Sequence, residues 1–163
     1  MRLIATTLTA YFVLSLISPT ARADNFQSIE STPVDELWLN AGFYSYHFQK
    51  NIDLDNNNFG LGFEYRYSSI GSVTAGRFHN SDKEMSNYVA WCWQPWALGP
   101  VRIGALLGAI NGYPKAFDRA WFPLALPLAS VEYKNFGLNF TIVPTYKETL
   151  HGSITLQLKV KLY

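Results

Sequence analysis

The sequence predicts an all-β protein: an eight-stranded antiparallel transmembrane β-barrel of the outer-membrane type, which follows a cleaved signal peptide. Period-2 alternation of apolar and polar residues, with turn motifs at short intervals, predicts strands rather than helices. Aromatic residues make up 16% of the chain and charged residues only 15%. After the leader, no stretch is apolar and long enough for a transmembrane helix, so a membrane location would require strands.

The N-terminus has the organisation of a secretory signal peptide. Arg2 supplies a positive charge, residues 3–17 form an uncharged apolar stretch, and residues 21–23 (ARA) form a small-x-small cleavage site. The stretch is too short for a comfortable spanning helix, so export is the better interpretation. We therefore predict a signal peptide over 1–23, a short polar segment over 24–36 and the barrel over 37–163.

Eight β-type segments follow, separated by turn signals such as Gly99-Pro100 and Lys134-Asn135. They cover residues 37–49, 57–69, 71–81, 85–97, 100–111, 121–134, 136–147 and 151–163. The polar segment before them contains Pro33, which limits any helix there to a short piece. Alternation is clearest in the second and last segments, which predicts strands between two unlike environments.

Periodicity does not show which face of these strands points outward. A lipocalin-like soluble barrel would turn the apolar face inward, and an outer-membrane barrel would turn it to lipid. Gly60 and Gly62 favour lipid because they lie on the polar face and suit a crowded interior. Trp91, Trp93 and Trp96 favour it too, since they cluster where an interfacial aromatic girdle would fall. Eight strands leave no aqueous channel, which argues against a porin.

Composition excludes several function classes. Cys92 is the single cysteine, so no intramolecular disulfide can form. With a formal charge of only +1, the chain lacks the excess of basic residues that is typical of a nucleic-acid-binding protein. There is no metal-ligand cluster, P-loop or dinucleotide fingerprint, so we expect no metal and no cofactor. We expect a monomer.

Two prolines interrupt the apolar runs between Trp121 and Tyr146. Because proline cannot donate to a strand ladder, Pro127 and Pro144 predict a local gap in hydrogen bonding between or beside two strands. Within a membrane such a gap is costly, which suggests an opening with a purpose. The plain alternative is two prolines on edge strands.

The same stretch carries a family resemblance. LPLASVEY followed by IVPTY, with prolines 17 positions apart, resembles the lipid A palmitoyltransferase (PagP) family of outer-membrane enzymes. The resemblance implies that Pro127 and Pro144 flank a lateral gate through which lipid enters the barrel. It also implies a phospholipid as acyl donor and lipid A as acceptor.

From spacing alone, each of the three histidines is a polar residue at a strand end. The resemblance maps His47 onto the family's histidine at the end of the first strand. The family's Asp-Ser pair maps onto Asn80 and Ser81, so an amide stands where the family has a carboxylate. The implied catalytic set is His47, Asn80 and Ser81, with His79 as the base if the register differs.

These residue types suit acyl transfer to a hydroxyl. Histidine can remove the acceptor's proton, and the Ser81 hydroxyl can act as nucleophile or donate to the developing oxyanion. Asn80 can orient an imidazole but cannot stabilise its charged form. Activity could therefore be reduced or lost, or Asp82 could replace the carboxylate, although Asp82 is also an ordinary turn residue.

The resemblance also places Cys92 at the floor of the family's acyl-chain pocket. Cysteine is bulkier than the small residue that admits a long chain, which predicts a shallower pocket and a shorter preferred acyl chain. The alternative is a buried cysteine that acts as a small hydrophobe.

Three hypotheses follow. The first is an outer-membrane acyltransferase that moves a fatty acyl chain from a phospholipid to lipid A, with its site at the extracellular rim. The second is a non-catalytic outer-membrane barrel with a structural or lipid-binding role, which the asparagine at position 80 favours. The third is a soluble periplasmic lipid-binding barrel.

Overall fold

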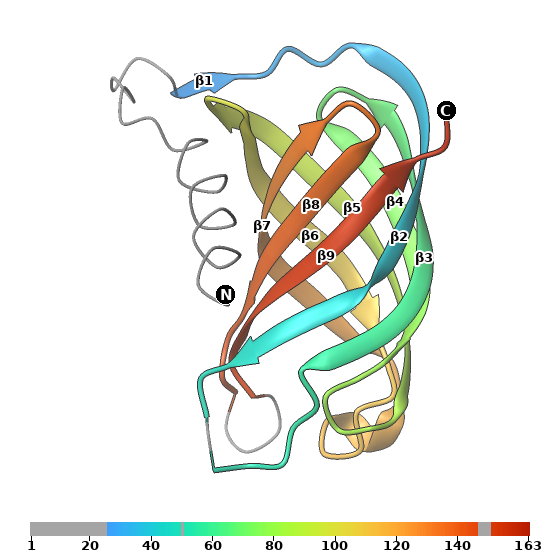
Figure 1. The fold of residues 1–163 in the computed structure, drawn as a ribbon, viewed down its shortest axis with the longest axis vertical. Helices are drawn as coiled ribbons and strands as arrows, with labels where there is room; N and C mark the ends of the chain where they lie inside the picture. The colour runs from blue at the N-terminus through green and yellow to red at the C-terminus, as the bar shows by residue number, and fades with distance from the viewer. Residues whose placement is uncertain (1–25, 50, 147–150) are drawn as a thin grey trace, which may run out of the picture.

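The computed structural model describes residues 26–49, 51–146 and 151–163 as an antiparallel β-barrel (Figure 1). It confirms the predicted fold class. The short strand β1 and the eight barrel strands are β1 Phe26–Ser28, β2 Pro33–His47, β3 Asn57–Ser68, β4 Gly71–His79, β5 Met85–Leu98, β6 Val101–Ile110, β7 Phe122–Tyr133, β8 Phe136–Val143 and β9 Ser153–Lys161. The predicted signal peptide lies outside the described residues.

Each barrel strand pairs with its neighbours in the chain, and β2 closes the ring against β9, from Trp38 opposite Lys161 to His47 opposite Ser153. Two-residue turns join strands at one end, such as Lys134-Asn135 with its positive φ of 54° at Lys134. The other end carries the longer connections, and it lies opposite the C-terminus (Figure 1). The barrel therefore has a compact end and a loop-bearing end.

The polar segment before the barrel forms strand structure in its described part. β1 pairs with the end of β5, with Phe26 opposite Leu98, and β2 already begins at Pro33. Apart from the short 3-10 turn η2 (Phe117–Arg119), the elements of the described residues are strands. None of the described helical structure is long and apolar enough to cross a membrane.

The apolar faces of the strands point outward. In β9, Ile154 and Leu158 are exposed, whereas Thr155, Gln157 and Lys159 are buried in the interior. The same holds for β3, where Phe59 is 76% exposed and Glu64 only 2%. The lipocalin-like arrangement, with the apolar face inward, is therefore excluded.

A bulge in β2 decides which residues of this strand face inward. The register shifts between residues 41 and 43 against β3 and between residues 40 and 43 against β9. Trp38 and Asn40 are buried before the shift, and Ser45 and His47 after it, so the inward parity changes from even to odd. Gly42 fits here because a Cβ at this position would lie 2.1 Å from the carbonyl oxygen of Asn58. Without the bulge His47 would point outward.

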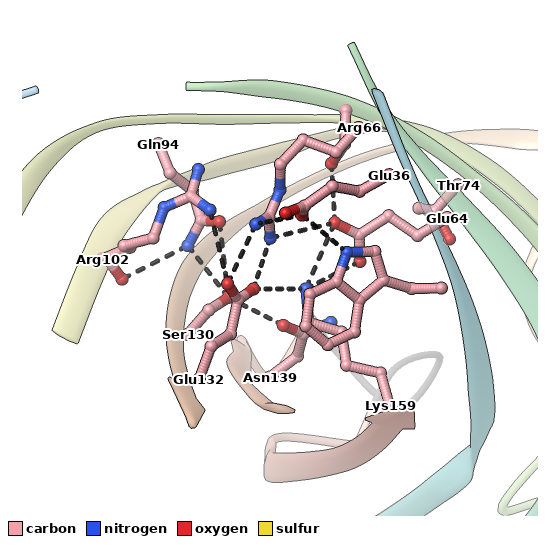
Figure 2. Close-up of polar contacts among 12 residues, drawn as sticks. Glu36, Glu64, Arg66, Thr74, Gln94, Arg102, Ser130, Glu132, Asn139 and Lys159 are labelled. Carbon is pink, nitrogen blue, oxygen red and sulfur yellow. Dashed lines mark hydrogen bonds and ion pairs between the residues drawn. The ribbon is translucent and has the colours of Figure 1, made fainter. Parts of the chain in front are cut away.

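A charged cluster fills the interior near the compact end (Figure 2). Lys159, 1% exposed, contacts Glu64 at 3.0 Å and Glu132 at 2.9 Å. The Arg66 guanidinium pairs with Glu36 at 3.0 Å, with Glu64 at 3.7 Å and with Glu132. The buried Trp38 ring stacks beneath these cations, with the Lys159 ammonium 4.6 Å from its centroid. Glu64 and Arg66, which share the inward face of β3, thus form an interior ion pair.

Candidate functional site

Between the charged cluster and the loop-bearing end, the barrel holds a pocket lined by all eight barrel strands. One side of its wall is mainly apolar and the other mainly polar. Strands β4 to β7 contribute mainly apolar side chains: Phe78, Tyr88, Ala90, Cys92, Leu106, Ile110, Phe122, Leu124, Leu126 and Leu128. Strands β2, β3, β8 and β9 contribute mainly polar ones: Ser45, His47, Asn58, Asn139, Thr141, Ser153, Thr155 and Gln157. The apolar wall suits a hydrocarbon chain.

His47 lies at the rim of this pocket, at the end of β2. Its side chain is 8% exposed, and Nδ1 lies 2.9 Å from the amide oxygen of Asn56. An amide oxygen only accepts hydrogen bonds, so Nδ1 carries the proton and Nε2 keeps a lone pair. A neutral imidazole held in this tautomer is arranged to take up a proton.

Ser81 lines the same pocket as His47. A polar chain from β2 and β3 reaches it: Ser45 Oγ donates to Asn58 Oδ1 at 2.6 Å, and Asn58 Nδ2 donates to Ser81 Oγ at 3.4 Å. The backbone carbonyl of Ser81 also accepts a hydrogen bond from the Asp55 N–H at 3.0 Å. Since Asn58 donates to its oxygen, the Ser81 hydroxyl can donate its own proton elsewhere.

Asn80 is fully buried and organises the turn that presents Ser81. Its Nδ2 donates to the Gly112 carbonyl at 2.8 Å and to Ser86 Oγ at 2.9 Å. Its Oδ1 accepts from the backbone N–H groups of Asp82 at 2.9 Å and Glu84 at 3.0 Å. Every hydrogen-bonding position of this amide is therefore engaged by groups other than an imidazole.

The two other candidate residues at this rim, His79 and Asp82, differ in their relation to the pocket. His79 is exposed on the outer side of β4, opposite Met85, whereas the lining of the pocket includes Asp82. Two ion pairs tie the connections around the mouth together, Lys83 to Asp53 at 2.6 Å and Arg119 to Glu84 at 2.8 Å. The hydrogen bond to Asp53 raises the pKa of the Lys83 ammonium, so this link is charged at neutral pH.

The seam between β7 and β8 is open toward the loop-bearing end. Pairing runs from Tyr133 opposite Phe136 to Leu128 opposite Thr141 and then stops. Beyond that point β7 still pairs with β6 as far as Phe122, without a break across Pro127. The edge that lacks the proline N–H therefore faces β8. Pro144 follows the end of β8 directly, so the two prolines flank this gap in the ladder.

Cys92 lies deep in the pocket, on the inner face of β5. It is 4% exposed, and the neighbouring strands place Ser72 and Leu106 opposite it. It lies toward the charged cluster, because Ser72, its partner on β4, donates to Glu64 of that cluster at 2.9 Å. Across the described residues, no His, Cys, Asp or Glu side chains gather in a group of three or more that could hold a metal ion.

Sequence reasoning missed three contributors to this site. Asn56 precedes the second predicted segment and Asn58 lies within it, on the face of Gly60 and Gly62, yet neither was predicted to belong to the site. His151 was noted as a strand-end residue, yet it lines the same pocket. No local pattern identifies His151 as a neighbour of His47, because β9 meets β2 only when the ring closes.

Fold and site together define a class: an eight-stranded β-barrel, apolar outside, with a partly apolar interior pocket, an open seam and a rim that carries histidine and serine. No protein-family model matches the sequence. The chain is 34% identical over 116 residues to the Lipid A acyltransferase PagP of Laribacter hongkongensis (strain HLHK9). The similarity covers 66% of this chain and 54% of that protein, so the chain matches about half the length of this relative. This similarity agrees with the resemblance to the PagP family that the sequence indicated.

Proposed function

We propose that this protein is an outer-membrane acyltransferase that moves a fatty acyl chain from a phospholipid to lipid A. The observation that carries the proposal is the open β7–β8 seam beside an interior pocket whose rim holds His47 and Ser81. The similarity to a lipid A acyltransferase supports the same reaction. A donor lipid would enter sideways between Pro127 and Pro144, and its acyl chain would lie along the apolar wall.

The rim residues can perform the transfer without a cofactor. His47 Nε2 takes the proton of the acceptor hydroxyl, and that oxygen bonds to the acyl carbon of the donor ester. The Ser81 hydroxyl donates to the oxyanion that develops on the carbonyl oxygen. The bond from the acyl carbon to the glycerol oxygen then breaks, and this oxygen takes up a proton. Asn80 contributes by fixing the turn that presents Ser81.

The outer surface supports a membrane location. Large apolar side chains cover it, including Phe59, Leu61 and Phe63 of β3, each more than half exposed. Trp91 and Trp96 add an aromatic patch on β5, where Trp91 Nε1 donates to the Tyr67 hydroxyl at 2.7 Å. We assign residues 1–23 as the signal peptide that directs export, and the protein as a monomer in the outer membrane.

Mass spectrometry of lipid A tests the function. Cells that express the protein should contain lipid A with one additional acyl mass, which cells without it lack. His47→Ala and Ser81→Ala should each reduce the product about 100-fold or more, because each removes a group that acts in the transition state. His79→Ala is the matched control: this histidine lies at the same rim but on the outer face, so the product should persist. Unchanged lipid A in cells with a folded wild-type barrel would refute the proposal.

The second candidate is a non-catalytic outer-membrane barrel with a structural or lipid-binding role. The observation that favours it is Asn80, whose amide is engaged within its own turn and brings no charge to an imidazole. Asp82 could supply the carboxylate, since its side chain lines the pocket. The same mass measurement separates the two candidates, and Asp82→Asn shows whether this carboxylate takes part.

A further inference from the structure

A second histidine, His151, lines the same pocket as His47 and directly precedes the Gly152 that leads into β9. Its Nδ1 lies 2.9 Å from the side-chain oxygen of Gln49. Its Nε2 is buried and has no hydrogen-bond partner among the described residues. A buried polar atom without a partner is costly, and one at a ligand pocket is explained when the ligand supplies the partner.

The two histidines are held in the same way. In each, Nδ1 donates its proton to an amide oxygen. The acceptor is Asn56 Oδ1 at 2.9 Å for His47 and Gln49 Oε1 at 2.9 Å for His151. Because Nδ1 carries a proton in either case, each ring is ready to exchange a proton at Nε2. The pocket rim therefore presents two imidazoles of matching tautomer.

The strand register places the two histidines on adjacent segments. His47 of β2 lies opposite Ser153 of β9, and the Phe48 N–H donates to the Gly152 carbonyl at 3.0 Å beyond the end of the ladder. His151 is two residues along the neighbouring segment from Ser153, a diagonal relation that corresponds to about 7–8 Å in a regular antiparallel pair. One ester carbon can lie between two groups at this separation.

We propose that His151 is a second catalytic residue of the acyl transfer, and this inference rests on the proposed function. His47 Nε2 takes the proton of the acceptor hydroxyl, while His151, protonated at Nε2, gives its proton to the glycerol oxygen as the ester bond breaks. One proton is taken and one is given, and the products are acylated lipid A and a lysophospholipid. Between turnovers, His47 releases its proton to water at the rim and His151 regains one.

Two acyl donors with different leaving groups test this role. Purified wild type and His151→Ala are compared with a phospholipid and with a p-nitrophenyl ester of the same fatty acid, with lipid A as acceptor for both. A glycerol alkoxide needs a proton to depart, whereas p-nitrophenolate leaves as an anion. His151→Ala should therefore lose about 10²- to 10⁴-fold with the phospholipid and stay within a few-fold of wild type with the nitrophenyl ester. His47→Ala should lose activity with both donors.

The controls separate this role from a structural one. His151→Gln keeps a polar side chain that cannot act as an acid, and it replaces His151→Ala if that variant does not fold, as judged by circular dichroism. His79→Ala should retain activity with both donors. An equal loss with both donors, or no loss with either, would overturn the role of His151. A folded wild type that transfers from neither donor would instead refute the proposed function.

Discussion

Asn80 illustrates how the surroundings of a side chain can account for its residue type. An asparagine in place of a catalytic aspartate suggests a weakened relay. The structure places both amide atoms in the turn between β4 and β5, where the nitrogen donates to the Gly112 carbonyl. A carboxylate could not make that hydrogen bond and would lie against a carbonyl oxygen instead. The amide is thus matched to its surroundings and presents Ser81.

Cys92 provides a prediction about the length of the transferred acyl chain. Replacing Cys92 with Gly should remove buried volume from the deep end of the pocket, so the transferred chain should lengthen by about one or two methylene groups. Cys92→Leu should shorten it. Val89→Ala, on the same strand but facing outward, should leave the chain length unchanged. Mass spectrometry of the acylated lipid reads the length directly, and an unaltered chain in both Cys92 variants would show that this residue does not set the depth.

Among the elements, β2 and β7 have the largest influence on the site. The bulge at Gly42 turns His47 into the barrel, and Pro127 on β7 lies where the ladder toward β8 has stopped. Both features are local defects in otherwise regular strands. Their combined effect is an opening in the wall near the rim where the histidine lies.

Closing the seam with a disulfide tests the opening. Extension of the register from Leu128 and Thr141 places Pro127 opposite Ile142, and both face outward. In the double variant Pro127→Cys with Ile142→Cys, oxidation should reduce transfer at least about tenfold, because pairing across the gap blocks entry of the donor. Added reductant should restore the rate.

Each single variant should be insensitive to oxidant, since the native Cys92 is buried on the inner face of β5 whereas positions 127 and 142 face outward. Mass analysis under non-reducing conditions verifies the bond. Full activity in a protein shown to carry the disulfide would exclude the β7–β8 seam as the route of entry.

The molecule as a whole has an apolar exterior around an interior that is charged near the compact end and partly apolar in the pocket. Lys159 makes close ion pairs with two carboxylates near the compact end, and Arg66 adds further pairs there (Figure 2). A buried ion pair contributes little net stability against a hydrophobic pair, but removal of one partner leaves a costly uncompensated charge. The cluster therefore bounds the pocket at its inner end and leaves the loop-bearing end and the seam for access.

The apolar exterior predicts how the protein fractionates. It should sediment with the outer membrane and resist extraction by alkaline carbonate, because detachment would expose the apolar outer faces of the strands to water. A soluble periplasmic marker protein in the same cells should be released by the wash. Recovery of the folded protein in the soluble periplasmic fraction would contradict the membrane location.

Much of the fold could be predicted because its signals are local. The eight predicted segments overlap the eight barrel strands, since alternation and turn residues act over a few neighbouring positions. The ends of β8 and β9 next to their connection were predicted longer than they are: β8 stops at Val143 and β9 begins at Ser153. The two prolines likewise predicted the gap in the hydrogen-bond ladder, because a missing N–H is a property of the residue itself.

The sequence by itself thus determined the strands, their two unlike faces and the residues that cannot complete a ladder. Only the tertiary structure decided that the apolar faces point outward, that the bulge turns His47 inward, and that Ser81, Asn58 and His151 meet at one rim. The physical reason is the range of the interactions. The alternation of apolar and polar residues depends only on neighbouring positions. Ring closure between β2 and β9, in contrast, joins positions more than a hundred residues apart.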